Sequence, residues 1–139
     1  MKLLFDDDYK LLDESGLKYQ EDFDQRFLVI NNYPLQKGQY IFGGKPLTEV
    51  GVLVIIPENY NMSGGDMFWT DLPIERADGI PIPAISPFGG GDNRFFIEKE
   101  YCRWSRHFSA ESWKGKVDTV EKILSRIEWA LRNPDGKPA

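Results

Sequence analysis

Hydrophobic residues in this chain follow two spacings, a helical one near the C-terminus and a strand-like one in the middle. The helical stripe has apolar residues at steps of three and four, namely Val117, Val120, Leu124, Ile127 and Leu131. This spacing predicts an amphipathic helix, capped by Asp118 and Glu121 and ended by Asn133-Pro134. A weaker pattern over residues 1–15 predicts a short first helix that stops at Gly16.

Short runs of β-branched and aromatic residues predict four strands, at 27–30, 39–42, 50–56 and 67–69. Residues 50–56 are apolar throughout, so this strand is expected at the centre of a sheet, buried on both faces. The connections are short and carry no helical pattern, which favours an antiparallel meander over a parallel sheet. The chain is therefore expected to be one α+β domain over residues 1–139.

The regular pattern stops between residues 72 and 93, where prolines and glycines are frequent. A loop of this length inside a compact domain is often functional. Its triplet Gly89-Gly90-Gly91 lacks the lysine and the following helix of a phosphate-binding loop. The triplet is better interpreted as a hinge in a flap beside an active site.

Composition and charge narrow the classes of function. The formal net charge is −5 and the pI is about 4.9, which argues against a nucleic-acid-binding surface. One cysteine excludes an internal disulfide, and we see neither a signal peptide nor an apolar run of the roughly 20 residues that a membrane span needs. A cytoplasmic protein without membrane segments is expected. The lone histidine offers no metal-ligand pattern, so we predict no metal and no cofactor.

The candidate chemistry lies just ahead of the C-terminal helix. Cys102 is the only cysteine and His107 the only histidine. Arg103, Arg106 and His107 follow Cys102, and positive charge favours the reactive thiolate. The alternative is a buried structural cysteine, because free cysteines are among the most buried residues.

Ser105 is a second candidate nucleophile. In an extended segment, residues 105 and 107 point to the same side, which would permit His107 to act as a base for the Ser105 hydroxyl. The alternatives are a serine that binds loop backbone and a histidine that organises the same loop. Trp104 and Trp113 are interpreted as packing anchors.

The order of these motifs resembles the ubiquitin-conjugating (E2) fold. Residues 50–69 resemble the third strand, the tyrosine-containing turn and the fourth strand of that fold, and SAESWKG at 109–115 resembles the segment after the catalytic cysteine. The helix at 117–134 resembles the one that follows. FLVINNYPLQKGQY at 27–40 and RWSRH at 103–107 resemble a bacterial branch, prokaryotic E2 family E. The resemblance covers residues 17–134 and leaves 135–139 as a tail.

The resemblance implies a UBC-like fold, with an N-terminal helix, a four-stranded meander, a long loop with the active site, and a C-terminal helix. It implies a transferase that accepts a ubiquitin-like protein from an E1-like enzyme, on Cys102 as a thioester or on Ser105 as an oxyester, and passes it to an amine. Members tend to be encoded beside E1-like enzymes, ubiquitin-like proteins and JAB-type peptidases, which are the expected partners.

The chain departs from the family pattern in several places. Asn61 follows Tyr60 where the family usually has a proline, and the spacing from Cys102 to Trp113 is slightly long, so that the usual spacing counted back from Trp113 falls nearer Trp104 or Ser105. His-Pro-Asn, whose asparagine helps to stabilise the oxyanion, is absent, and the nearby asparagine is Asn93, nine residues before Cys102. The alternative function is therefore a non-catalytic E2-like module that binds ubiquitin-like or E1-like proteins. A third hypothesis is an unrelated α+β domain that assembles through an exposed Trp129 and the 72–93 loop.

Overall fold

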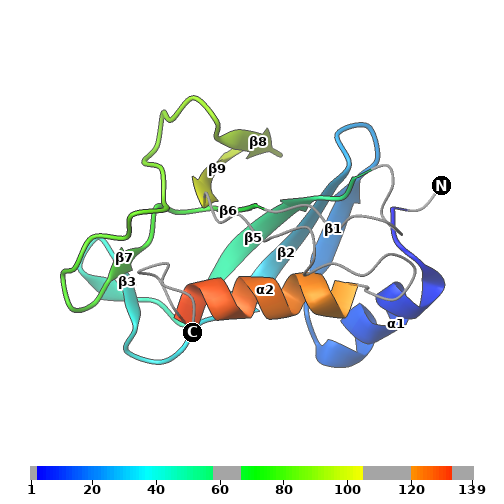
Figure 1. Ribbon diagram of the computed structural model, residues 1–139, viewed down its shortest axis with the longest axis horizontal. Coiled ribbons are helices and arrows are strands. Elements are labelled where there is room, and N and C mark those ends of the chain that lie inside the picture. The colour runs from blue at the N-terminus through cyan, green and yellow to red at the C-terminus, as the bar shows by residue number, and fades with distance from the viewer. Residues whose placement is uncertain (1–2, 58–66, 105–119, 133–139) are drawn as a thin grey trace.

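The computed structural model describes residues 3–57, 67–104 and 120–132, and within them the chain forms two helices and an antiparallel sheet that curls (Figure 1). The elements in chain order are α1 (Asp6–Ser15), β1 (Tyr19–Asp22), β2 (Phe27–Pro34), β3 (Tyr40–Phe42), β4 (Lys45–Pro46), β5 (Glu49–Ile55), β6 (Phe68–Thr70), β7 (Glu75–Arg76), β8 (Arg94–Phe96), β9 (Lys99–Trp104) and α2 (Val120–Arg132). This arrangement confirms the expected α+β class.

The main sheet has six strands in the order β1-β2-β5-β6-β9-β8, not the expected four-stranded meander. Strand β5 lies between β2 and β6 and is buried along most of its length, as its apolar sequence predicted. The segment predicted as the second strand, 39–42, forms β3 in a separate small sheet, β4-β3-β7. Gly43 and Gly44 both have positive φ and turn the chain back into β4, so β3 cannot continue into the main sheet.

Three strands of the main sheet, β1, β8 and β9, were not among the four predicted strands. The polar segment Tyr19–Asp22 forms the edge strand β1 and pairs with β2. Strand β9 pairs with β6 on one side and β8 on the other, so it lies inside the sheet. The 72–93 segment contains the two-residue strand β7 but is otherwise without long regular elements, in line with the predicted loop.

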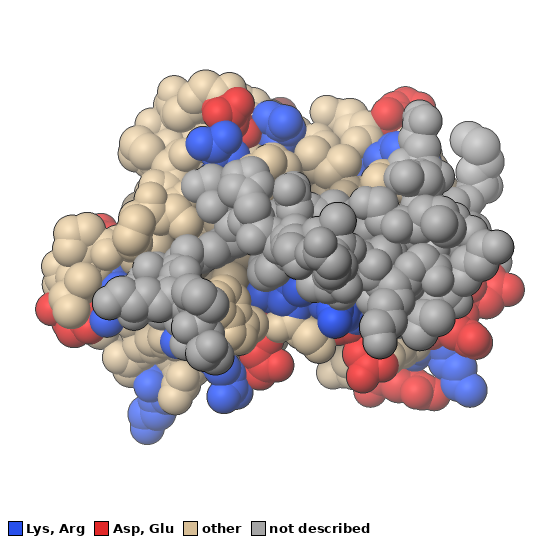
Figure 2. Space-filling model, in the orientation of Figure 1, with Lys and Arg blue, Asp and Glu red and all other residues tan. Residues whose placement is uncertain are grey.

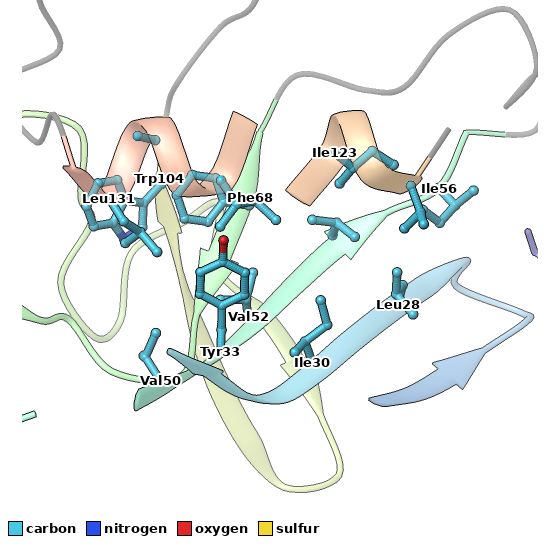
Figure 3. Close-up of a cluster of buried hydrophobic side chains, with 14 of the residues drawn as sticks. Leu28, Ile30, Tyr33, Val50, Val52, Ile56, Phe68, Trp104, Ile123 and Leu131 are labelled. Atoms are coloured by element: carbon cyan, nitrogen blue, oxygen red, sulfur yellow. The ribbon is translucent and has the colours of Figure 1, made fainter. Parts of the chain in front are cut away.

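Helix α2 covers one face of the sheet (Figure 1). Figure 3 shows Ile30, Val52 and Phe68 reaching from the strands toward this helix, which contributes Ile123 and Leu131 to the same buried cluster. The helical stripe is thus confirmed for the residues from 120 to 132. The predicted cap at Asp118 and the predicted end at Asn133-Pro134 lie outside the described residues.

Two tyrosine hydroxyls bind backbone carbonyls of α2 and fasten this helix to the strands. Tyr33 donates to the carbonyl oxygen of Leu124 at 3.3 Å, and Tyr40 donates to that of Leu131. Trp129 packs half-buried against the same core. The hypothesis of an exposed Trp129 patch is therefore wrong.

Helix α1 is joined to α2 by one buried carboxylate. Asp8 is 2% exposed; its Oδ2 accepts from the Phe5 N–H at 3.0 Å and its Oδ1 from the Val120 N–H at 3.1 Å. One side chain therefore satisfies backbone donors at the start of both helices, where such donors have no intrahelical partner. Gly16 has φ 78° and ends α1, as predicted. Figure 2 shows further acidic side chains gathered over α1.

A second apolar cluster lies on the opposite face of the sheet. It contains Phe27, Val29, Leu53, Trp69, Phe96 and Tyr101. The rings of Phe96 on β8 and Phe27 on β2 meet edge to face at 6.4 Å, although three strands separate β8 from β2 in the sheet order. The sheet therefore curls, and β8 closes over its own concave face. No helix within the described ranges is long and apolar enough to span a membrane.

Candidate functional site

Cys102 lies in β9, opposite Thr70 of β6, and none of its surface is exposed. Its neighbours along the strand, Tyr101 and Trp104, are buried on opposite faces of the sheet. The site that the sequence placed in a reachable loop is therefore part of a paired strand. The catalytic role of Cys102 remains a prediction, and its burial is evidence for the structural alternative.

The charges around Cys102 favour the neutral thiol over the thiolate. Burial raises the pKa of the Cys102 thiol to about 11, and the carboxylates of Glu100 and Asp71 act in the same direction. Because side chains alternate along a strand, Glu100 shares the face of Cys102 whereas Arg103 points to the other. The Arg103 guanidinium is moreover paired with Asp92 at 2.7 Å. Strand geometry thus turns Arg103 away from the thiol, and the expected thiolate-stabilising effect of this residue is not found.

Asp71 is a residue near the thiol that the sequence reasoning missed. Its Oδ1 accepts from the Gly51 N–H at 3.0 Å, and Lys99 lies 3.8 Å from its Oδ2. Burial raises the pKa of this carboxyl group. A Cβ added at Gly51 would lie 2.7 Å from Asp71 Oδ2, so a larger residue would displace the Asp71 carboxylate from this position.

Asn93 lies beside β9, as the oxyanion hypothesis requires, but its polar atoms are already engaged. Its Nδ2 donates to the Pro87 carbonyl at 2.8 Å and to Glu100 Oε2 at 2.7 Å, and its Oδ1 accepts from the Arg103 N–H at 3.1 Å. An amide has two N–H hydrogens, and both are used here. The oxyanion role of Asn93 stays a prediction, while the structure gives this side chain a role in holding the loop to β9.

The other sequence candidates, Ser105 and His107, lie outside the described residues, as do Arg106 and Trp113. Trp104 is fully buried, stacks on Phe68 at 5.2 Å and donates to Thr70 Oγ1 at 3.3 Å. Its predicted role as a packing anchor is confirmed. Among the residues with described positions, no group of three or more His, Cys, Asp or Glu side chains is placed to hold a metal ion.

A pocket of about 310 Å³ lies in the proline-rich loop, and Cys102 is not among its lining residues. Its lining is mainly proline and isoleucine, including Ile74, Ile80 and Ile85, with Glu75 and Arg76 as the charged members. Arg76 is paired with Asp78 at 2.6 Å. The pocket offers contact surface for apolar side chains.

The raised thiol pKa predicts a pH dependence of stability. Because the folded-state pKa is about 11 against an ordinary 9.0, the unfolded chain releases this proton first. Below about pH 9 the buried neutral thiol makes its full contribution to the free energy of unfolding. As the pH rises from about 9 to about 11, the free energy of unfolding falls by up to ~3 kcal/mol.

The measurement is urea unfolding of the wild-type protein and Cys102→Ala between pH 8 and 11. The difference in free energy between the two proteins should narrow across this range. Tyrosines such as Tyr33, whose pKa burial raises to about 12, affect both proteins alike. A difference that stays constant with pH would show that the thiol titrates normally.

Comparison with known proteins gives one match. The family model of prokaryotic E2 family E matches residues 4–134, nearly the whole chain. No curated protein and no solved structure matches. The ordered motifs that suggested this family are thus confirmed, and the match also includes α1, which the resemblance left out. The chain belongs to prokaryotic E2 family E.

Proposed function

We propose that this chain is an E2-like binding module of a bacterial ubiquitin-like conjugation pathway. It binds an E1-like enzyme or a ubiquitin-like protein without carrying the modifier on Cys102. Family membership supports the pathway and the kinds of partner. The observation that carries the non-carrier role is the complete burial of the only cysteine in a paired strand.

Carrying a modifier as a thioester makes two demands on a cysteine. The thiolate must attack the carbonyl carbon at the end of the modifier, and the surroundings must leave room for that protein tail. Cys102 has no exposed surface, and its thiol pKa is about 11. At neutral pH only about one thiol in 10,000 would be ionised. Acylation would therefore require the structure around Cys102 to open.

Among the described residues, Asn93 does not offer a free N–H donor for the oxyanion. Both N–H hydrogens of Asn93 are engaged, and Glu100 and Asp71 would place negative charge beside a negative intermediate. Oxyanion stabilisation depends on preorganised donors aimed at the developing charge. This arrangement supports binding better than transfer.

The test combines the protein with an E1-like enzyme and a ubiquitin-like protein of the same pathway. Affinity is measured for the wild type and for Cys102→Ala, and covalent products are sought on a non-reducing gel in the presence of ATP. The proposal expects equal affinities for the two proteins and no adduct. The affinity measurement is repeated with a JAB-type peptidase of the same pathway as a third partner.

The products distinguish this proposal from the two carrier functions. A reductant-sensitive adduct that is lost in Cys102→Ala would establish a thioester carrier and overturn the proposal. An adduct that survives reductant and Cys102→Ala but is lost in Ser105→Ala would assign an oxyester to Ser105, with His107→Ala testing the base. Absence of binding to all three partners would also contradict the proposed role.

A further inference from the structure

Residues 86–93, called the strap here, run beside β9 and are attached to it on both sides of Cys102. The Ser86 N–H donates to the Arg103 carbonyl at 2.9 Å, and the Asn93 side chain accepts from the Arg103 N–H at 3.1 Å. Both backbone groups of Arg103 are therefore satisfied by the strap. Glu100, two residues before Cys102, provides the second attachment.

Glu100 and Asn93 form the centre of this attachment and are called the latch. Glu100 Oε2 accepts from the Gly89 N–H at 2.6 Å and from Asn93 Nδ2 at 2.7 Å. Asn93 is 7% exposed and also donates to the Pro87 carbonyl within the strap. A carboxylate that accepts two N–H bonds is a charge-assisted contact, stronger than bonds between neutral groups.

The strap has the backbone that such a contact requires. Gly89 has φ 82°, a conformation in which an L side chain is strained. A Cβ at Gly90 would lie 3.2 Å from Asn93 Oδ1 and from the Pro87 carbonyl oxygen. The glycines read from the sequence as a hinge thus allow a tight turn against the latch.

The strap binds the residues of β9 on either side of the buried Cys102 thiol. Within the described residues, neither apolar cluster includes Cys102, although the thiol has no exposed surface. The Glu100 carboxylate is close enough to raise the thiol pKa. The strap is attached to β9 at Glu100 and Arg103, which flank Cys102 on the two sides.

We infer that the strap is a cover for Cys102 and that the Asn93–Glu100 latch keeps it closed. Opening of the latch, and not unfolding of the domain, then controls access to the thiol. This inference rests on the proposed function, in which Cys102 is withheld from the partners, and names the residues that withhold it.

The experiment measures the rate at which iodoacetamide alkylates Cys102 in the full-length protein alone, without denaturant, by mass spectrometry. Asn93→Ala removes three hydrogen bonds of the latch without changing the charge, so labelling should be faster by about tenfold or more. Glu100→Ala should have a similar effect, but it also removes a charge that raises the thiol pKa.

Two control variants separate the effects. Glu100→Gln removes the same charge but keeps an acceptor oxygen, so Glu100→Ala should be labelled faster than Glu100→Gln. Tyr33→Phe removes a hydrogen bond to α2 at 3.3 Å, far from the latch in sequence. It should lower overall stability yet leave the labelling rate within about twofold of the wild type.

Labelling of Asn93→Ala at the wild-type rate would overturn the inference, as would equal rates for Glu100→Ala and Glu100→Gln. The inference would also be overturned if the labelling rates of the four variants followed their overall stabilities and rose steeply with urea concentration, as labelling through global unfolding does. The assay contains no partner protein. A thioester adduct in the partner assay therefore defeats the proposed function, whereas unchanged labelling defeats only the latch.

Discussion

Replacing Trp104 with alanine is expected to lower the free energy of unfolding by about 4 kcal/mol. The indole is fully buried in the cluster beneath α2, stacks on Phe68 and donates its N–H to Thr70. The substitution would remove the ring contacts, leave a cavity between β9 and the helix, and deprive the Thr70 hydroxyl of its donor.

Urea unfolding followed by circular dichroism measures this loss. Trp104→Phe keeps one ring on Phe68 and should cost less, about 2 kcal/mol. Phe95→Ala on the neighbouring strand β8 is the matched surface control, because this ring is 64% exposed. It should change stability by less than about 0.5 kcal/mol. A Trp104→Ala loss below about 1 kcal/mol would contradict the packing described for this cluster.

Replacing Asp8 with alanine is expected to cost about 3 kcal/mol. This carboxylate is buried and accepts from Phe5 and Val120. The variant would leave two backbone N–H groups without their acceptor and would remove negative charge from the N-terminal end of both helices. Because one group serves both helices, the loss should exceed that of an ordinary helix cap.

Thermal and urea unfolding of three variants test this link. Asp8→Asn keeps an acceptor oxygen and should lose about half as much as Asp8→Ala. Asp7→Ala removes an exposed carboxylate from the same helical turn and should cost at most about 0.5 kcal/mol. Equal losses for Asp7→Ala and Asp8→Ala would show that only the helix dipole is involved, and not the contact with Val120.

Periodicity and apolar content predicted the elements that pack against the core. The stripe from Val120 to Leu131 can bury its apolar side chains only as an amphipathic helix. The apolar run of β5 is buried as a central strand. The order of motifs also predicted the family to which the chain belongs.

The strands that were not predicted are segments without a strand-like sequence pattern, which become strands by pairing with a neighbouring strand. The segment of β1, YQED, is polar, and it becomes a strand only because β2 offers it a free edge. In the segment of β9, KEYCRW, Tyr101 belongs to one apolar cluster and Trp104 to the other. Its hydrophobic residues therefore show neither the helical nor the strand-like spacing clearly. The segment of β3 has strand-forming residues, but two glycines turn it away from the main sheet.

The chemical environment of Cys102 was not predicted correctly from the sequence. Sequence neighbours suggested a cationic environment for Cys102, because Arg103 follows it directly. Once β9 is known to be a strand, alternation places Glu100 on the face of Cys102 and Arg103 on the other. Asp71 reaches the site from β6 and the following turn, a long-range contact that the sequence does not encode as a pattern.

The most direct test of the central claim is the intact mass of the protein after incubation with its E1-like enzyme, its ubiquitin-like protein and ATP, without reductant. If Cys102 carries no modifier, we expect the protein to be recovered at its unmodified mass while it remains bound to a partner. A species heavier by one ubiquitin-like protein, restored to the original mass by reductant and missing in Cys102→Ala, would show that the buried thiol is a working carrier.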